Sequence, residues 1–246
     1  MTKKNILVTG SSRGIGLAIA LKLAREGNNV VINGRNRKVL DKIKNKNKNI
    51  DIVVGDFSSP FKSKAMIKKT TKMLKTLDVL VCNIGLSKSC KPNKESYSEW
   101  KKMFDFNFFA SSNPIEHAKN EIIKTKGSII VIGSGAANKF IKGAPITYST
   151  AKTAITFYAK SLAYYLGSFG VRVNVIAPGN TYFKGSNWDK KLKKNKNQVK
   201  KLIKNTVPLN RFASTDEIAE LTSYLISDKA KFANGAVFTI DGGQTI

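Results

Sequence analysis

Cysteine and histidine are almost absent from this sequence of 246 residues. It contains 2 cysteines, Cys82 and Cys90, and 1 histidine, His117. Two cysteines cannot build a disulfide framework, and with a lone histidine they form no His/Cys cluster of the kind that binds zinc or iron. We therefore expect no metal site and no metal-dependent chemistry.

Long apolar runs are missing as well. No segment approaches the length that spans a bilayer. The start of the chain, Met1-Thr2-Lys3-Lys4 before a short apolar strand, lacks the hydrophobic region of a signal peptide. We therefore predict a cytoplasmic protein without membrane insertion.

Acidic residues are scarce. There are 16 of them against 43 lysines and arginines, which gives a formal net charge of +27. One hypothesis is binding of nucleic acid or of an anionic membrane surface, since lysine runs occupy residues 42–48, 190–196 and 200–204. Another is compositional: lysine, asparagine and isoleucine replace arginine, glutamine and leucine throughout, as an AT-rich genome would produce.

The distribution of the lysines favours the compositional hypothesis. They are spread over many segments, alternate with asparagine rather than with aromatic residues, and accompany no evident nucleic-acid module. We therefore predict no specific nucleic-acid partner. A third hypothesis stays open, in which a positive rim around a substrate entrance attracts an anionic substrate or an acidic carrier protein.

What the sequence does have is a regular alternation of apolar strands and helical segments. Apolar residues make up 41% of the chain, enough for a substantial core. The alternation, without linker or repeat, predicts one α/β domain over residues 1–246, a doubly wound, seven-stranded parallel sheet with helices on both faces. Ligands should bind at the carboxyl ends of its strands. The expected strands are Ile6–Thr9, Val30–Asn33, Asp51–Val54, Val79–Cys82, Ser128–Ile132, Arg172–Ile176 and Ala236–Ile240.

A glycine-rich turn follows the first expected strand. Thr9-Gly10-Ser11-Ser12-Arg13-Gly14-Ile15-Gly16 leads into Leu17–Ala24, a segment of helical composition. Glycines let the backbone approach a pyrophosphate, whose charge is met by free N–H groups and by the helix dipole. The spacing differs from G-x-G-x-x-G, so the strand and helix context carries the prediction of a dinucleotide site.

The end of the second expected strand indicates which dinucleotide binds. An acidic residue there would favour NAD, but the chain reads Gly34-Arg35-Asn36-Arg37. Arg35 and Arg13 could hold a 2′-phosphate between two guanidiniums. We therefore prefer NADP(H), with NAD(H) as the other cofactor. The alternative is that both arginines are solvated members of a basic surface.

Tyr148 and Lys152 predict acid–base chemistry. Spaced four residues apart in a helical segment, they would share one helical face. A nearby ammonium favours phenolate and should bring the phenol pKa down from about 10. Ser134 could hydrogen-bond a carbonyl oxygen and hold it against the tyrosine. Such pairs also arise by chance in helices, so it is the accompanying glycine turn that favours hydride transfer to a carbonyl.

Together these motifs resemble the short-chain dehydrogenase/reductase family in its single-domain, Rossmann-type form, over nearly the whole chain. The resemblance implies that Asn107, Ser134, Tyr148 and Lys152 form a catalytic tetrad. Tyr148 would be the general acid/base, Lys152 would also hold the nicotinamide ribose, and Asn107 would support a water that links Lys152 to solvent. Implied cofactor contacts come from Gly10, Ser12, Arg13, Gly14, Ile15, Gly16, Arg35, Asn36, Asp56, Phe57, Asn83, Ile84, Gly85, Tyr148, Lys152, Pro178, Gly179 and Thr181.

The sequence departs from the family pattern at three places. Cys82-Asn83-Ile84-Gly85 stands where the family usually reads Asn-Asn-Ala-Gly. Phe183 lies five positions past Pro178, where the family often has a threonine that contacts the cofactor, and the nearest hydroxyl is that of Thr181. Residues 184–189 match no particular substrate class.

The resemblance implies an NADP(H)-dependent oxidoreductase that transfers hydride between nicotinamide and a carbonyl or secondary alcohol. The motif order is most similar to 3-oxoacyl-(acyl-carrier-protein) reductases, so a 3-oxoacyl thioester is the first substrate to expect. A sugar-derived or other small hydroxy or keto compound is the alternative. A non-catalytic dinucleotide-binding or nucleic-acid-associated protein is a third reading, against which the tetrad argues.

The resemblance also implies a substrate lid at residues 184–206 and a homotetramer. Leu192, Val199, Leu202 and Ile203 could form the apolar face of one short lid helix, with lysines outward. The alternative is a solvated basic helix without substrate contact. Apolar residues after the tyrosine could serve the tetramer or the core equally well; they are Phe157, Leu162, Tyr165 and Leu166.

Overall fold

A computed structural model describes residues 3–246, in which seven parallel strands form one sheet. The first two residues of the expected domain lie outside this described part. The strand order is β3-β2-β1-β4-β5-β6-β7. All seven expected strands are confirmed, with small differences at their ends. They are β1 (Asn5–Val8), β2 (Asn29–Gly34), β3 (Ile50–Val54), β4 (Val79–Cys82), β5 (Ser128–Ile132), β6 (Arg172–Pro178) and β7 (Val237–Ile240).

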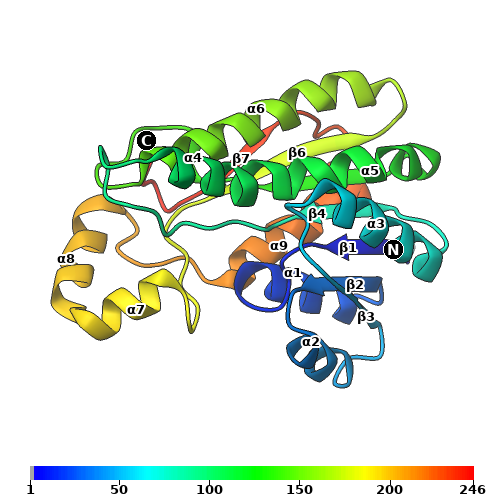
Figure 1. Cartoon of the computed structure of the whole chain (residues 1–246), viewed down its shortest axis with the longest axis horizontal. Helices are drawn as coiled ribbons and strands as arrows, with labels where there is room; N and C mark the ends of the chain where they lie inside the picture. The colour runs from blue at the N-terminus through cyan, green and yellow to red at the C-terminus, as the bar shows by residue number, and fades with distance from the viewer. Residues whose placement is uncertain (1–2) are drawn as a thin grey trace.

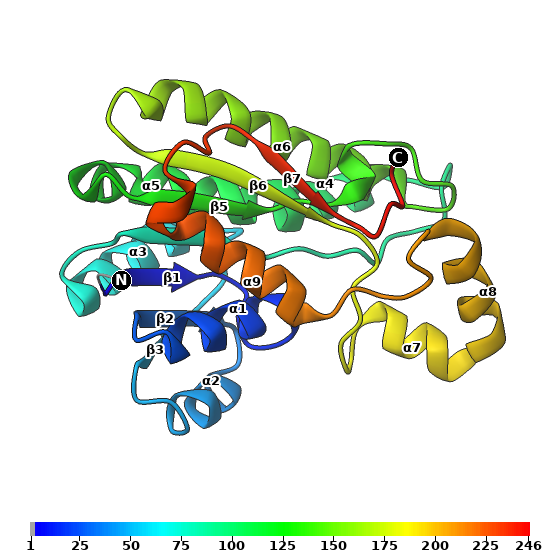
Figure 2. The same cartoon turned by 180° about the vertical axis from the view of Figure 1, so that it is seen from behind.

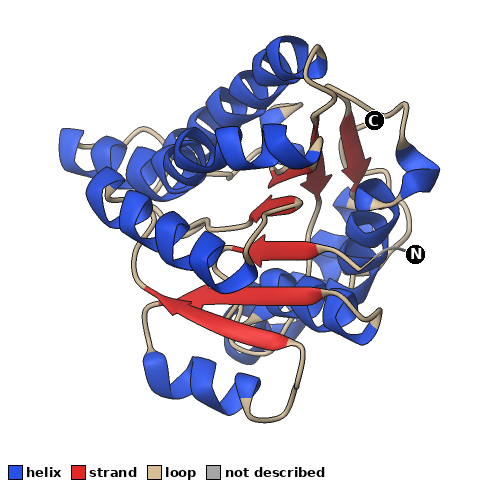
Figure 3. Cartoon of the chain, turned by 90° about the vertical axis from the view of Figure 1, so that its right-hand side faces the viewer, coloured by secondary structure: helices blue, strands red, loops and turns tan. Residues whose placement is uncertain are grey.

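Helices cover both faces of the sheet, as Figures 1 and 3 show. One face carries α1 (Gly14–Arg25), α2 (Arg37–Lys44) and α9 (Thr215–Ile226). The other carries α3 (Pro60–Leu74), α5 (Ala110–Thr125) and α6 (Ile146–Gly167). The main body also contains a short helix, a π-helical turn and two 3-10 turns. They are α4 (Tyr97–Phe104), η1 (Asp105–Phe109), η2 (Gly135–Ala137) and η3 (Asp228–Ala230). Within residues 3–246 no helix is long and apolar enough to cross a bilayer.

The two-sided core explains why the strands are apolar at nearly every position. Successive side chains of a strand point to opposite faces of the sheet. Ile6 and Val8 pack in the cluster with α1 and α9, whereas Leu7 packs in the cluster with α3, α5 and α6. Both faces are therefore buried, and continuous rather than alternating hydrophobicity results.

The strand order reverses between β1 and β4, and this reversal positions the site. From β1 the chain proceeds outward to β2 and β3, then returns through α3 to place β4 on the other side of β1. In such sheets the connections leave in opposite directions at this point, which opens a crevice at the carboxyl ends of the two strands. The glycine turn follows β1, and Asn83-Ile84-Gly85 follows β4.

Two further helices, α7 (Asn187–Lys194) and α8 (Lys196–Thr206), project from the main body. Figures 1 and 2 show this α7–α8 segment extending from one end of the molecule beside the chain that leaves β6. It has a small apolar cluster of its own. The cluster consists of Val199, Ile203 and Val207, with Trp188, Leu192 and Phe212 packed against it.

The expectation of a single lid helix was wrong in this segment. Asn195 ends α7 and starts α8, because its side chain accepts a hydrogen bond from Gln198 N. The break changes which residues face inward. Val199 and Ile203, four residues apart, point into the cluster, whereas Leu202 is 42% exposed and was wrongly assigned to the apolar face. The lysines of both helices lie outward, as expected.

Candidate active site

Buried polar side chains hold the glycine turn against the ends of β2 and β4. Thr9 Oγ1 accepts a hydrogen bond from Asn83 N at 3.0 Å, and Gly10 N donates to Asn33 Oδ1 at 3.1 Å. Asn83 Nδ2 donates in turn to Thr9 O at 3.1 Å and Gly10 O at 3.0 Å. Thr9 and Asn33 are 0% and 1% exposed. The sheet therefore fixes the backbone of the turn.

The glycines of this turn have no room for a side chain. A methyl group at Gly16 would lie 2.4 Å from Asn83 Nδ2, and one at Gly10 would lie 2.8 Å from Ile84 Cγ1. Gly10 and Gly14 both have a φ of 59°, the left-handed conformation that favours glycine. The turn consequently presents backbone rather than side chains to the crevice.

Helix α1 begins at Gly14 without a side-chain cap. Arg13, at the N-cap, has extended backbone and makes no capping hydrogen bond. The N-cap side chains of α2, α3, α4 and α9 do accept such bonds; they are Asn36, Ser59, Ser96 and Ser214. The first-turn N–H groups and the positive dipole end of α1 thus remain for an anion. The uncapped turn fits the pyrophosphate of a dinucleotide.

The adenosine side of the expected site joins the glycine turn to the end of β2. A methyl group at Gly34 would lie 3.1 Å from Ser12 Cβ, so these two segments touch. Arg35 is exposed, and its guanidinium lies 5.8 Å from the centroid of the Phe106 ring. Arg13 Nη1 instead donates to Gly185 O at 3.4 Å. The two arginines have separate contacts here, and their phosphate clamp stays a prediction.

Three other predicted cofactor residues have structural contacts of their own. Asn36 Oδ1 accepts from Val39 N at 3.3 Å and caps α2. Asp56 Oδ1 accepts from Ser58 N at 2.9 Å and from Ser58 Oγ at 2.8 Å. The Phe57 side chain is fully buried in the sheet core, so only its backbone could face a nucleotide. The cofactor roles of these residues stay predictions.

Lys152, Asn107 and Gly85 meet at the carboxyl edge of the sheet. Lys152 lies on α6, is 3% exposed, and donates from Nζ to Ile132 O at 2.8 Å. A methyl group at Gly85 would lie 3.1 Å from Asn107 Oδ1 and 3.2 Å from Lys152 Nζ. Three segments that are distant in sequence therefore converge here. Sequence reasoning had selected all three residues.

A π-helical turn carries Asn107. Its Oδ1 accepts from Leu86 N at 3.0 Å, and its Nδ2 donates to Leu86 O and Met103 O, both at 3.0 Å. The side chain is fully buried and ties η1 to the segment after β4. Single π turns inside helices occur frequently at functional sites. The turn was not expected from the sequence, since no residue pattern announces it.

Tyr148 and Ser134 form the second half of the cluster. Burial raises the pKa of Tyr148, and a hydrogen bond with Ser134 opposes this increase. Ser134 Oγ accepts from Ala136 N at 3.2 Å, which leaves its own proton to donate to the phenol oxygen. The pair is placed as the sequence predicted, one group after β5 and the other on the first turn of α6.

The expected effect of Lys152 on the tyrosine was wrong for this conformation. Burial raises the pKa of Tyr148 and the hydrogen bond with Ser134 lowers it, whereas Lys152 does not contribute to lowering it. Burial also lowers the pKa of Lys152 to about 8, against an opposing influence of Cys82. The ammonium is directed to the Ile132 carbonyl instead. Spacing on a helix placed both side chains on one face but did not determine where the flexible lysine would donate.

The chain after β6 carries the last predicted cofactor contacts. Gly179, directly after Pro178, donates from N to Ile240 O at 3.0 Å. Thr181 is 7% exposed, and its hydroxyl donates to Gly179 O at 3.2 Å. The hydroxyl proton of Thr181 is therefore used by a nearby backbone carbonyl in this conformation. The cofactor roles of this segment stay predictions.

Two residues that position the site, Asn33 and Phe183, were not among the predicted ones, whereas Thr9 opens the predicted cofactor motif. Asn33 places a buried polar side chain one residue before the end of the apolar strand β2, and this position was the available signal. Phe183, which departs from the family pattern, places its ring against Gly14. In the described residues 3–246, no three His, Cys, Asp or Glu side chains are grouped so that they could hold a metal ion.

Comparison with known proteins agrees with this geometry. The family model described as enoyl-(acyl carrier protein) reductase, a short-chain dehydrogenase/reductase model, matches residues 10–245. The 3-oxoacyl-[acyl-carrier-protein] reductase of Staphylococcus aureus is 32% identical over 246 residues, covering 98% of each chain. Glucose 1-dehydrogenase 2 of Bacillus subtilis is 32% identical over 254 residues, covering 100% of this chain and 96% of that protein.

A solved structure extends the similarity to the fold. The L-sorbose reductase of Gluconobacter frateurii, complexed with NADPH and L-sorbose, superposes with a TM-score of 0.92 at 26% identity. The match covers 100% of this chain and 97% of the other. The Rossmann-type, doubly wound architecture expected from the sequence is thereby confirmed.

Proposed function

We propose that this protein, which belongs to the short-chain dehydrogenase/reductase family, is an NADP(H)-dependent oxidoreductase acting on a carbonyl or secondary alcohol. One observation carries the proposal. Asn107 and Lys152 converge at Gly85, and Ser134 bonds Tyr148, beside the uncapped amino end of α1. A proton donor and a dinucleotide cradle at one edge of the sheet are what carbonyl reduction requires.

The proposed roles of the four polar residues are those that the family resemblance implies. A bound nicotinamide supplies or accepts the hydride, and the chain handles the proton. Tyr148 donates it to the substrate oxygen, and its raised pKa keeps that proton in place at neutral pH. Ser134 hydrogen-bonds the same oxygen and orients it. By the family resemblance, Lys152 would also hold the nicotinamide ribose, and Asn107 would support a water that links Lys152 to solvent.

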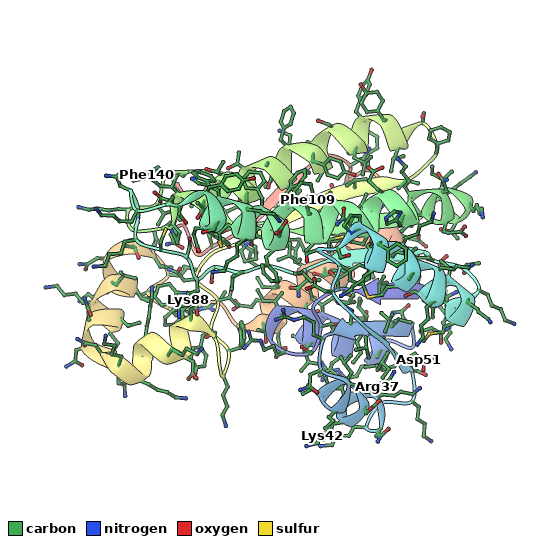
Figure 4. All side chains as sticks on the ribbon, viewed as in Figure 1. Arg37, Lys42, Asp51, Lys88, Phe109 and Phe140 are labelled. Atoms are coloured by element: carbon green, nitrogen blue, oxygen red, sulfur yellow. The ribbon has the colours of Figure 1, made fainter. Side chains whose placement is uncertain are left out.

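NADP(H) is the proposed cofactor because the ribose-reading position is basic. Arg35 follows β2 where an acidic residue would read a ribose hydroxyl, and Arg13 lies on the neighbouring turn. The NADPH in the L-sorbose reductase structure supports this choice. The backbone of residues 10–16, the ends of β2 to β4, and Asn83, Ile84 and Gly85 would hold the dinucleotide. Arg37 and Lys42 of α2 add positive charge on this side (Figure 4).

A 3-oxoacyl thioester is the substrate proposed first. The similarity to 3-oxoacyl-[acyl-carrier-protein] reductase supports it. The α7–α8 segment, within the proposed lid at 184–206, presents mainly positive charge, which suits an acidic carrier or a phosphate-bearing thioester. Its exposed lysines are Lys190, Lys191, Lys193, Lys194, Lys196, Lys200, Lys201 and Lys204.

A sugar-derived or other small polyhydroxy substrate is the second candidate, favoured by polar groups near the tyrosine. Thr147 directly precedes Tyr148, and its Oγ1 lies 2.9 Å from Ser89 Oγ. Asn187 Nδ2 donates to Ser87 Oγ at 2.8 Å, which links α7 to the segment after β4. Thr147 is fully buried, so Ser87 and Asn187 are the groups of this set that could bind hydroxyls. The similarities to L-sorbose reductase and glucose 1-dehydrogenase 2 agree with such a substrate.

Nicotinamide turnover by the purified protein tests both candidates. NADPH and NADH oxidation would be followed with acetoacetyl thioesters, keto sugars and simple ketones. Turnover on a thioester supports the first substrate, and turnover confined to keto sugars supports the second. Tight dinucleotide binding without turnover on any carbonyl would favour the non-catalytic alternative.

We further propose a cytoplasmic homotetramer that pairs the α5–α6 face. Phe157, Tyr164 and Tyr165 of α6 are 71%, 82% and 70% exposed, and Phe109, directly before α5, is 43% exposed. Figure 4 labels Phe109 on this face. Leu166, considered for the same role, is 6% exposed and belongs to the core. Sedimentation equilibrium would measure the assembly directly.

A further inference from the structure

The ring of Phe183 covers the first residue of α1. A methyl group at Gly14 would lie 2.6 Å from Phe183 Cζ, 2.8 Å from Cε2 and 2.9 Å from Cε1. Three ring atoms at this distance mean that the phenyl group stands directly over the glycine. Gly14 accommodates it because it has no side chain and adopts a φ of 59°.

The ring lies at the helix end where an anion would be expected to bind. The first turn of α1 has N–H groups without a capping side chain, and a helix dipole that favours negative charge. A phenyl group cannot accept hydrogen bonds from these N–H groups as a phosphate oxygen does. In dinucleotide-binding folds the pyrophosphate comes closest to the backbone at this turn. A pyrophosphate bound at this turn would meet the Phe183 ring.

A tight turn holds Phe183 in this position. Ser186 N donates to Phe183 O at 3.0 Å, and Gly185 has the positive φ of 83° that such a turn requires. Just before it, Tyr182 N donates to Ala213 O at 3.0 Å. Anchored on that side, the turn projects the ring toward α1.

The same turn is joined to α7. Asp189 on α7 is 6% exposed, and its Oδ2 accepts from Gly185 N at 2.9 Å. Its Oδ1 accepts from Tyr182 Oη at 3.1 Å. The turn and the first turn of α7 consequently form one unit, so that displacement of the ring displaces the start of the α7–α8 segment.

We infer that Phe183 is a gate on the dinucleotide site. The inference rests on the proposed cofactor, whose pyrophosphate must displace the ring from Gly14. A 2′-phosphate must also release Arg13 from Gly185 O, a contact of the same turn. Cofactor binding thereby moves the turn and, through Asp189, the α7–α8 segment. Dinucleotide binding and the position of the substrate lid become coupled.

A gate of this kind lowers the apparent affinity for the cofactor. If the ring lies on Gly14 in about nine molecules out of ten, the apparent Kd is raised about tenfold over that of the open form. It also limits the rate at which a ligand can enter. Observed association rates should level off at high dinucleotide concentration, where ring displacement becomes limiting.

Stopped-flow binding of NADPH to Phe183→Ala and Phe183→Leu tests the gate. We expect association about tenfold faster for the alanine variant than for wild type, an intermediate value for leucine, and no plateau in the alanine variant. Phe232→Ala is the matched control, because Phe232 is exposed and lies just after η3, on the chain that enters β7 at its amino end. The melting temperature of each variant checks that folding is intact.

Tryptic cleavage of the α7–α8 lysines, without added nucleotide, gives a readout that does not depend on cofactor. Phe183→Ala should be cleaved faster than wild type, because the turn is no longer held on Gly14. Unchanged association and cleavage rates, or weaker NADPH binding by Phe183→Ala, would overturn the gate alone. Failure of both wild type and the alanine variant to bind NADPH and NADH would contradict the proposed function, and the gate with it.

Discussion

The proposed catalytic cluster and the α7–α8 segment lie at the same edge of the sheet but are built differently. Asn107 and Lys152 are 0% and 3% exposed, and both donate to backbone carbonyls. The α7–α8 segment instead packs on a small cluster of its own and presents lysines outward. A proton-transfer group needs a fixed position, whereas a segment that admits substrate must move. If the proposed roles hold, the main body meets the first requirement and the α7–α8 segment meets the second.

Removing the acid should produce the largest effect, confined to the catalytic cluster. Tyr148→Phe is expected to lower turnover about 10²–10⁴-fold, because it deletes one proton donor, while NADPH binding stays near wild type. Initial rates and fluorescence titration measure the two quantities. Tyr165→Phe, a change of the same kind at a 70% exposed tyrosine of α6, is the control. Retained turnover in Tyr148→Phe would refute the assigned acid.

A smaller effect is expected at the ribose end of the crevice. Arg35→Asp should reduce the preference for NADPH over NADH about 10–100-fold, because a charge-assisted hydrogen bond is replaced by repulsion of the 2′-phosphate. The ratio of kcat/KM for the two cofactors measures it. Lys38→Asp makes a similar charge change at an exposed residue of α2. If both variants shift the ratio equally, the basic surface rather than Arg35 reads the phosphate.

The buried lysine gives a prediction on stability. The pKa of Lys152 in the folded protein is lowered to about 8, below its ordinary value of 10.5, because of burial. Between these values the unfolded chain binds the proton and the folded chain does not, so stability rises with pH across that window. Lys152→Met removes the titrating group and should raise the melting temperature at pH 7.

The difference in melting temperature between Lys152→Met and wild type should depend on pH. The gain from Lys152→Met should shrink as pH increases from about 8 toward 10.5, while activity is lost throughout. Lys160→Met, at an exposed position of the same helix, should show no such dependence. A constant difference in melting temperature between wild type and Lys152→Met would mean that Lys152 does not titrate in this range.

The smallest effect is expected in the α7–α8 segment. Ile203→Ala should lower the free energy of unfolding by about 2 kcal/mol, because it leaves a cavity in a small cluster. This value is at the low end for buried aliphatic positions. Leu202→Ala, at a 42% exposed neighbour, should cost less than about 0.5 kcal/mol. Urea unfolding and tryptic cleavage of the segment distinguish them. Equal costs would contradict the two-helix arrangement.

Much of the main body could be predicted because its strands and site motifs are marked by residues close together in the sequence. Runs such as Ile6-Leu7-Val8 are apolar throughout because both faces of the sheet are covered. The Tyr148–Lys152 spacing on a helix and the glycine turn after a strand are also local patterns. The α7–α8 segment could not be predicted as well, since a cap at Asn195 decided which apolar residues turned inward.

The sequence by itself determined the order of strands and helices, the family, and which residues are available for chemistry. These follow from residue types and short spacings, which hold wherever the chain folds. Only the tertiary structure decided that Lys152 donates to Ile132 O and that burial raises the pKa of Tyr148. It alone also placed Phe183 on Gly14. Those features depend on distances between segments far apart in the chain, which packing sets and local pattern does not encode.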